Sequence, residues 1–250
     1  MNDTLSISLK TSWTNSIVSF NRIPKPAPLF NQQAIWRAPS DAGFYIWGGV
    51  TSYFARPPAV EVWKLVADGN GKGEWHQEPI TGVTEARLIR FTRTAQLAYT
   101  HSPTVGFWIG GYANAQTDIK VTGDGYLAPP GVMSFDMVSG ELKNESSAGL
   151  HRYGTLVGGS AQWVPYGSEG SLVFLGGAEA PVSTTYNGWA GVSFASLPVW
   201  DVFGKLCTMG LKVVLTLDSQ EVVSTADQRG TTNATRALLC CGCSGAQQNI

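Results

Sequence analysis

Three stretches decide the fold: FYIWGG at residues 44–49, GFWIGG at residues 106–111 and LVFLGG at residues 172–177. Each is a run of apolar and aromatic residues that ends in two glycines, namely Gly48 and Gly49, Gly110 and Gly111, and Gly176 and Gly177. The first glycines of successive pairs are 62 and 66 residues apart. Self-similarity at a nearly constant spacing indicates a repeat architecture in which each repeat is one supersecondary unit.

Strand-like segments surround each glycine pair. Before the pairs lie QAIWRAP at 33–39, AQLAYTHS at 95–102 and GGSAQWVPYG at 158–167. After them lie EVWKLVADGNGKGEW at 61–75, GVMSFDMVSGELKNES at 131–146 and FASLPVWDVFGKL at 194–206. Period-2 alternation and glycine-containing turns predict strands joined by hairpins, so each unit is expected to contain four strands. LSISLKTSW at 5–13 matches the second half of a unit that has no glycine pair before it.

The composition agrees with an all-β protein and excludes some classes of partner. The 250 residues include 29 glycines and 9 tryptophans, only 14% are charged, and the formal net charge is −1. A chain this neutral has no broad basic surface, so no nucleic-acid partner is expected. The first residues contain no apolar core of a signal peptide, and no run approaches the roughly 20 apolar residues of a membrane span. The sequence thus predicts no membrane segment and indicates no particular localisation.

The last part of the chain loses the repeat pattern. We expect a repeat region over 1–206 and a divergent, irregular tail over 207–250, explained either by disorder or by a shifted reading frame. All four cysteines lie in this tail, at Cys207, Cys240, Cys241 and Cys243. A C-C-x-C run lacks the two-residue spacing with which paired thiolates approach one zinc ion. We therefore expect no metal and no cofactor, and the function of the cysteines is left open.

The repeats resemble those of the kelch family, and more narrowly the kelch proteins of filamentous fungi, over roughly residues 5–205. That resemblance implies a partial β-propeller of about three to four four-stranded blades, one half-blade being N-terminal, which is too short to close as a normal ring. It also implies that the glycine pair ends the second strand, where close neighbours leave little room for Cβ atoms. In that family a tryptophan of the fourth strand packs between blades; Trp13 and Trp75 match it, whereas Leu142 and Leu206 replace it in the other units.

No arrangement of residues typical of catalysis is found. The three histidines lie in different units, the 69–73 glycines sit in a hairpin rather than before a helix, and no nucleophile elbow or H-E-x-x-H occurs. We therefore expect a non-catalytic protein that binds a protein or glycan partner. The alternative is a remnant of a secreted or surface galactose-oxidase-like kelch enzyme. The copper centre of such enzymes needs a cysteine, and residues 1–206 contain none.

The loops after the glycine pairs are the candidate binding surface. Because they occupy the same place in each unit, they are expected on one face of the molecule. They comprise 50–58, 112–130 and 178–191, with the candidate residues Tyr53, Phe54, Arg56, Tyr186, Asn187 and Trp189. Unpaired edges of a partial propeller are also expected to promote association between molecules.

Overall fold

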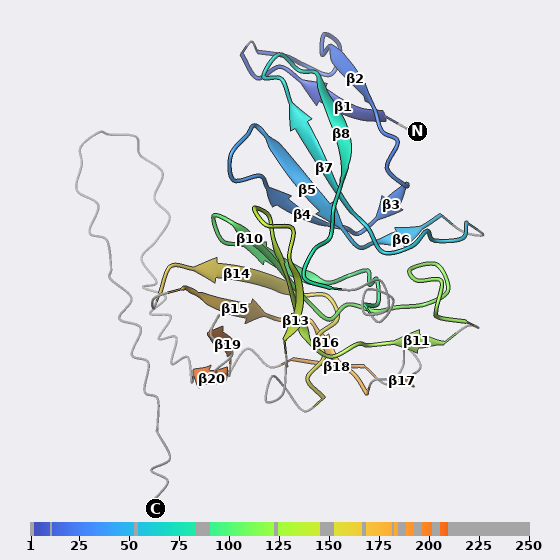
Figure 1. The fold of residues 1–250 in the computed structure, drawn as a ribbon, viewed down its shortest axis with the longest axis vertical. Coiled ribbons are helices and arrows are strands. Elements are labelled where there is room, and N and C mark those ends of the chain that lie inside the picture. Colours follow the sequence, from blue (N-terminus) through green and yellow to red (C-terminus); the bar gives the residue numbers. More distant parts are fainter. Residues whose placement is uncertain are drawn as a thin grey trace, which may run out of the picture.

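The structure is a computed structural model, and its architecture is built from β-strands (Figure 1). It describes residues 3–10, 12–52, 55–83, 91–122, 125–145, 153–166, 169–181, 183–184, 189–192, 197–201 and 206–209, the backbone alone at 183–184, 197–201 and 206–209. Within these ranges there is no α-helix. None of the described residues forms a helix long and apolar enough to cross a membrane.

Three antiparallel sheets of four strands correspond to the three repeat units. In each, the four strands lie in chain order, and the short strands within its span lie between the second and third: one in each of the first two units and three in the third. The first sheet contains β4 (Ala34–Arg37), β5 (Gly43–Trp47), β7 (Val62–Ala67) and β8 (Gly73–Glu78). The second contains β9 (Ala98–His101), β10 (Val105–Ile109), β12 (Val132–Asp136) and β13 (Leu142–Glu145). The third contains β14 (Ser160–Val164), β15 (Ser171–Leu175), β19 (Leu197–Asp201) and β20 (Leu206–Met209).

Each glycine pair directly follows the second strand of its sheet and has a left-handed backbone. The φ angles are +76° and +99° at the first pair, +58° and +82° at the second, and +65° and +87° at the third. A left-handed residue also precedes each first strand by two positions: Gln32 at +59°, Gln96 at +52° and Gly158 at +70°. The chain thus turns sharply at matching places in all three units.

Beyond these turns the first and second strands of each unit pair again in a short ladder. In the first unit β3 (Phe30–Asn31) pairs with β6 (Val50–Thr51), and Ala95 with Tyr112 and Val157 with Ala178 form the matching bridges in the others. Further short strands are β11 (Tyr126–Leu127), β16 (Ala178–Glu179), β17 (Ser183–Thr184) and β18 (Ala190–Gly191). β11 pairs with β17 and β16 with β18.

The sheets pack face to face, with their first strands β4, β9 and β14 adjacent. Between the first and second sheets, the Trp108 ring lies 5.4 Å from that of Trp36 and 4.6 Å from that of Trp47. Between the second and third, Phe107 and Ile109 join a buried apolar cluster that includes Phe174. Successive sheets related in this way form a propeller-like arc that is not closed, which confirms the predicted all-β fold class.

The N-terminal sheet has two strands, β1 (Asp3–Ile7) and β2 (Phe20–Pro24), as expected for half a unit. The role predicted for Trp13 is wrong. Trp13 lies in the segment that links β1 to β2 and is 43% exposed, because β2, rather than the stretch around Trp13, is the fourth strand of this unit. Trp75 lies in β8, is buried with Ile23 of β2, and donates through Nε1 to Thr4 Oγ1 at 3.0 Å. Trp75 therefore lies where the N-terminal and first sheets meet.

The strand pattern continues slightly further than predicted. β20 extends to Met209 as the fourth strand of the third sheet, so the boundary placed at 206 falls at the start of a strand. Cys207 lies in β20, whereas Cys240, Cys241 and Cys243 lie outside the described residues. At the predicted tryptophan position of the second unit, Leu142 is 1% exposed and fills the interface between the first two sheets.

Candidate binding face

The segments that follow the glycine pairs extend on one side of the arc (Figure 1). The short strands β3 and β6, β11 and β17, and β16 and β18 lie on this side, and the hairpin turns that join first to second strands lie on the other. We call this side the loop face. It contains residues 50–52 and 55–61 of the first unit, 112–122 and 125–131 of the second, and the described part of 178–192.

A buried arginine holds the loops of the first two units together. Arg93 is 1% exposed and precedes the first strand of the second sheet. Its guanidinium donates to the carbonyl oxygen of Pro58 at 3.0 Å, to that of Ala59, and to that of Thr117 at 3.5 Å. It also lies over the Phe30 ring, 4.6 Å from the centroid. We call these contacts the Arg93 clamp; they join two loops that are far apart in the sequence.

Carboxylates surround the clamp. Burial lowers the pKa of Arg93, and the charges of Glu61 and Asp118 oppose that decrease. Burial also raises the pKa of the Glu61 carboxyl, against the effect of the Arg93 charge. A buried cation is costly unless charges and hydrogen bonds compensate its lost hydration. Here three carbonyl oxygens and two nearby carboxylates provide that compensation.

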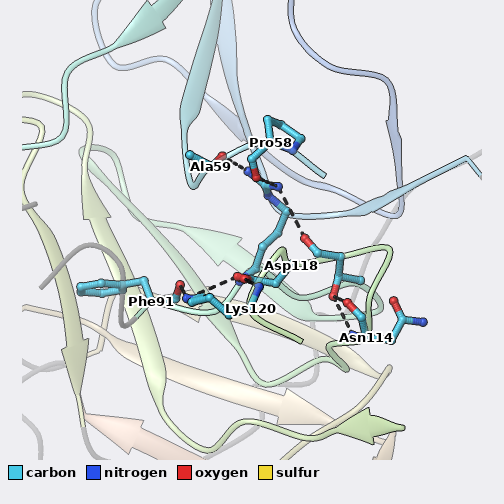
Figure 2. Close-up of polar contacts among 8 residues, drawn as sticks. Pro58, Ala59, Phe91, Asn114, Asp118 and Lys120 are labelled. Atoms are coloured by element: carbon cyan, nitrogen blue, oxygen red, sulfur yellow. Dashed lines mark hydrogen bonds and ion pairs between the residues drawn. The ribbon is translucent and has the colours of Figure 1, made fainter. Parts of the chain in front are cut away.

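Asp118 connects the clamp to the loop of the second unit (Figure 2). It is 2% exposed, and its Oδ2 accepts from the Arg93 backbone N–H at 2.7 Å. Its Oδ1 accepts from the Lys120 N–H at 2.9 Å, and Lys120 Nζ lies 3.4 Å from Oδ2 and also donates to the Phe91 carbonyl oxygen. Figure 2 shows Pro58 and Ala59 on one side of the network and Asp118 and Lys120 on the other.

A second link joins the same two loops. The Thr51 N–H donates to the Gln116 carbonyl oxygen at 3.0 Å, and Thr51 Oγ1 lies within hydrogen-bond distance of that oxygen, at 2.9 Å, and of the Ala55 carbonyl oxygen, at 2.8 Å. Gln116 lies in a tight turn in which Asn114 Oδ1 accepts from the Gln116 N–H at 2.9 Å. Since both links are largely buried, the first two loops hold each other in one conformation.

Three half-buried aromatic rings lie between the loops of the second and third units. The ring centroids of Tyr112 and Tyr126 are 5.3 Å apart, and that of Trp189 lies 6.3 and 6.2 Å from them. Tyr112 and Trp189 also pack on a small apolar cluster of Ala128, Val157 and Ala180. We call the three rings the aromatic cluster; it offers apolar and aromatic surface on the loop face.

Two of the six candidate loop residues fall within the described residues. Arg56 is exposed in the loop of the first unit, and Trp189 is half-buried in the aromatic cluster. Tyr53, Phe54, Tyr186 and Asn187 lie outside the described residues. The structure therefore places Arg56 and Trp189 in loops of different units.

The residue types that commonly act in catalysis or bind metals are dispersed in the described part of the chain. The His76 imidazole lies 3.8 Å from Glu74, and His101 Nδ1 lies 2.8 Å from the Ser102 carbonyl oxygen, in different sheets. Among the residues that the structure describes, no group of three or more histidine, cysteine or acidic side chains could hold a metal ion. Away from the loop face, a cavity of about 470 Å³ runs along β1 to the 69–72 turn, with Phe44 and Leu65 in its wall.

Comparisons with known proteins bear on the fold. No protein-family model matches the sequence, and no curated protein is significantly similar to it. Among solved structures, the structure of YjhT is similar, with a TM-score of 0.51 and 11% sequence identity. The match covers 85% of this chain and 60% of the YjhT chain, so the chain spans about three-fifths of that structure. Such a likeness supports a propeller-like β fold and nothing about activity.

Sequence reasoning missed the residues that hold the loop face together. Arg93 and Asp118 lie in polar stretches without a motif, and their partners are mostly backbone carbonyls and amides, which no residue pattern reveals. Tyr112 could have been found from the sequence, because it directly follows the second glycine pair, where the candidate loop begins. Its aromatic neighbours come from separate loops and become adjacent only through the fold.

Proposed function

We propose that this chain is a kelch-type, non-catalytic scaffold that binds a protein or glycan ligand with its loop face. The observation that carries the proposal is the Arg93 clamp, which fixes loops of two units against each other through buried hydrogen bonds. Binding is stronger when loops do not have to be ordered on association, because the entropic cost has been met in folding. Loops on a rigid scaffold are the usual location of binding residues.

The loop face carries both polar and aromatic groups that can bind a ligand. Exposed Arg56 supplies hydrogen-bond donors, and the aromatic cluster supplies rings for apolar contact. Tyrosine, tryptophan and arginine are the residues that most often dominate binding energies. The proposed resemblance to the kelch family, and to its fungal members, is supported by the three glycine pairs and by the apolar and aromatic residues that precede them.

The test uses two defined collections of probes, a glycan array and a displayed peptide library, with the purified full chain. For any probe bound, we expect Arg56→Ala and Trp189→Ala each to weaken binding at least about fivefold, whereas Glu169→Ala, in the β14–β15 turn on the opposite side, leaves it unchanged. Thermal melts of all three variants exclude unfolding as the cause. Equal binding by the loop variants, or binding lost only in Glu169→Ala, would refute the proposal. The galactose-oxidase-like remnant instead predicts that no probe binds.

A further inference from the structure

Among the described residues no further sheet follows the third one, so the face that is buried in the first two sheets is left without a sheet packed on it there. In each second strand, the last residue and the residue two before it point toward the following sheet. These are Trp47 and Tyr45 in β5, which are 1% and 2% exposed, and Ile109 and Phe107 in β10, which are 0% and 3% exposed. In β15 the residues at this register are Leu175, which is 38% exposed, and Val173, which is half-buried; the exposed Ser160 and Gln162 of β14 lie opposite them on the same face.

In the N-terminal sheet, the exposed face is the one that points away from the first sheet. Ile23 of β2 points toward the first sheet, so Leu5, Ile7 and Phe20, on the alternate positions of β1 and β2, point away from it. Leu5 is 41% and Phe20 is 49% exposed. The corresponding face of the second sheet is the one that points toward the preceding sheet. The first sheet covers it, and its residues Phe135 and Leu142 are each 1% exposed.

Exposed apolar side chains concentrate in the N-terminal segment that contains β1, the start of β2 and the link between them. Twelve large apolar residues are exposed in the described part of the chain, and five of them lie between residues 5 and 20. They are Leu5, Leu9, Trp13, Ile17 and Phe20, with exposed fractions from 41% to 84%. Scattered exposed apolar residues are ordinary, whereas a concentration of this kind marks an interaction surface.

We propose that a second copy of this chain covers these faces, with the third sheet of one molecule packed on the N-terminal sheet of the next. The two sheet interfaces seen within the chain join the same two kinds of face, with aromatic and aliphatic residues interleaved in both. Within β1 and β2 the charged residues are Asp3 and Arg22, and they pair with each other at 2.9 Å, so the face carries no unpaired charge along these two strands. Because the joined faces differ, the association is head to tail.

Two variants that each block one face test this directly. Leu5→Ser with Phe20→Ser removes the apolar N-terminal face, and Leu175→Lys places a charge on the face of the third sheet. Wild-type protein is expected to increase in mass with concentration in analytical ultracentrifugation. Each blocked variant alone is expected to remain monomeric, and an equimolar mixture to form a dimer that does not grow further, because each variant retains the face that the other has lost.

A control substitution and clear contrary results complete the test. Val138→Ser removes an apolar residue that is 73% exposed in the β12–β13 turn, away from both faces, and should leave the association unchanged. Circular dichroism and melting curves verify folding, and Leu175→Ser replaces Leu175→Lys if the lysine variant unfolds. The proposal is overturned if wild-type protein stays monomeric over the accessible range, if either blocked variant still associates alone, or if the mixture stays monomeric. These outcomes do not depend on ligand binding at the loop face.

Discussion

Gly110 and Gly111 have different neighbours, which explains why the repeat needs two glycines. A Cβ atom on Gly110 would lie 2.1 Å from the carbonyl oxygen of Leu156, in the lead-in to the next sheet. One on Gly111 would lie 2.5 Å from the carbonyl oxygen of Ala95, in the lead-in of its own sheet. The missing side chain of Gly110 thus lets the backbone of the following unit approach closely, and that of Gly111 lets the segment before the first strand of its own sheet approach.

Replacing Gly110 tests this at the scale of one residue. We expect Gly110→Ala to lower the free energy of unfolding by at least about 3 kcal/mol, since the left-handed φ of +58° alone costs about 1–2 kcal/mol and the backbone clash adds to it. Urea denaturation measures the change. Gly125→Ala is the control, because a Cβ atom there meets nothing within 4 Å, and its effect should stay below about 0.5 kcal/mol. Similar losses in both variants would contradict this account of the pair.

At the scale of elements, the four-stranded units could be predicted from the sequence, and the loop contacts could not. The strand positions follow from local signals, since apolar alternation and turn glycines act within a few residues. Trp13 was placed incorrectly because the link between β1 and β2 is longer than the corresponding turn in the first sheet, so the aligned tryptophan falls outside the strand. Arg93 was missed because backbone carbonyls of distant loops, rather than side chains of a motif, bind it.

The Arg93 clamp gives a prediction for the loops. Arg93→Met should lower the free energy of unfolding by about 3 kcal/mol, because it keeps most of the side-chain volume and leaves the carbonyl oxygens of Pro58 and Thr117 without their donor. Hydrogen exchange should also become faster in residues 55–61. Lys120→Met is the matched control, since that ammonium is partly exposed and its loss should cost about 1 kcal/mol or less. Unchanged stability of Arg93→Met would show that the clamp does not hold the loops.

At the scale of the whole molecule, stability depends on the contacts between sheets. Gly106 of β10 lies against the Trp36 indole of the first sheet, and a Cβ atom at position 106 would lie 2.3 Å from Trp36 Cδ2. The Trp36 ring fills this space, stacked 5.4 Å from Trp108. The missing side chain at Gly106 is thus what allows a tryptophan between the sheets.

A double-mutant cycle measures this dependence. Gly106→Ala alone should destabilise the protein by about 2 kcal/mol or more, and Trp36→Leu alone by a similar amount through lost packing. The double variant should be at least about 1 kcal/mol more stable than the sum of the two changes predicts, because the smaller leucine makes room for the new methyl group. Strict additivity would contradict direct packing between the two sites.

The first two glycine pairs each join their sheet to the next one, and amide hydrogen exchange measured residue by residue tests this most directly. The Gly49 N–H donates to the Thr94 carbonyl oxygen at 2.8 Å and the Gly111 N–H to that of Leu156 at 2.7 Å, both between units. We predict that these two amides exchange at least about a thousandfold more slowly than the exposed Gly69 and Gly125 amides. Exchange of Gly49 and Gly111 as fast as that of the exposed glycines would contradict the account.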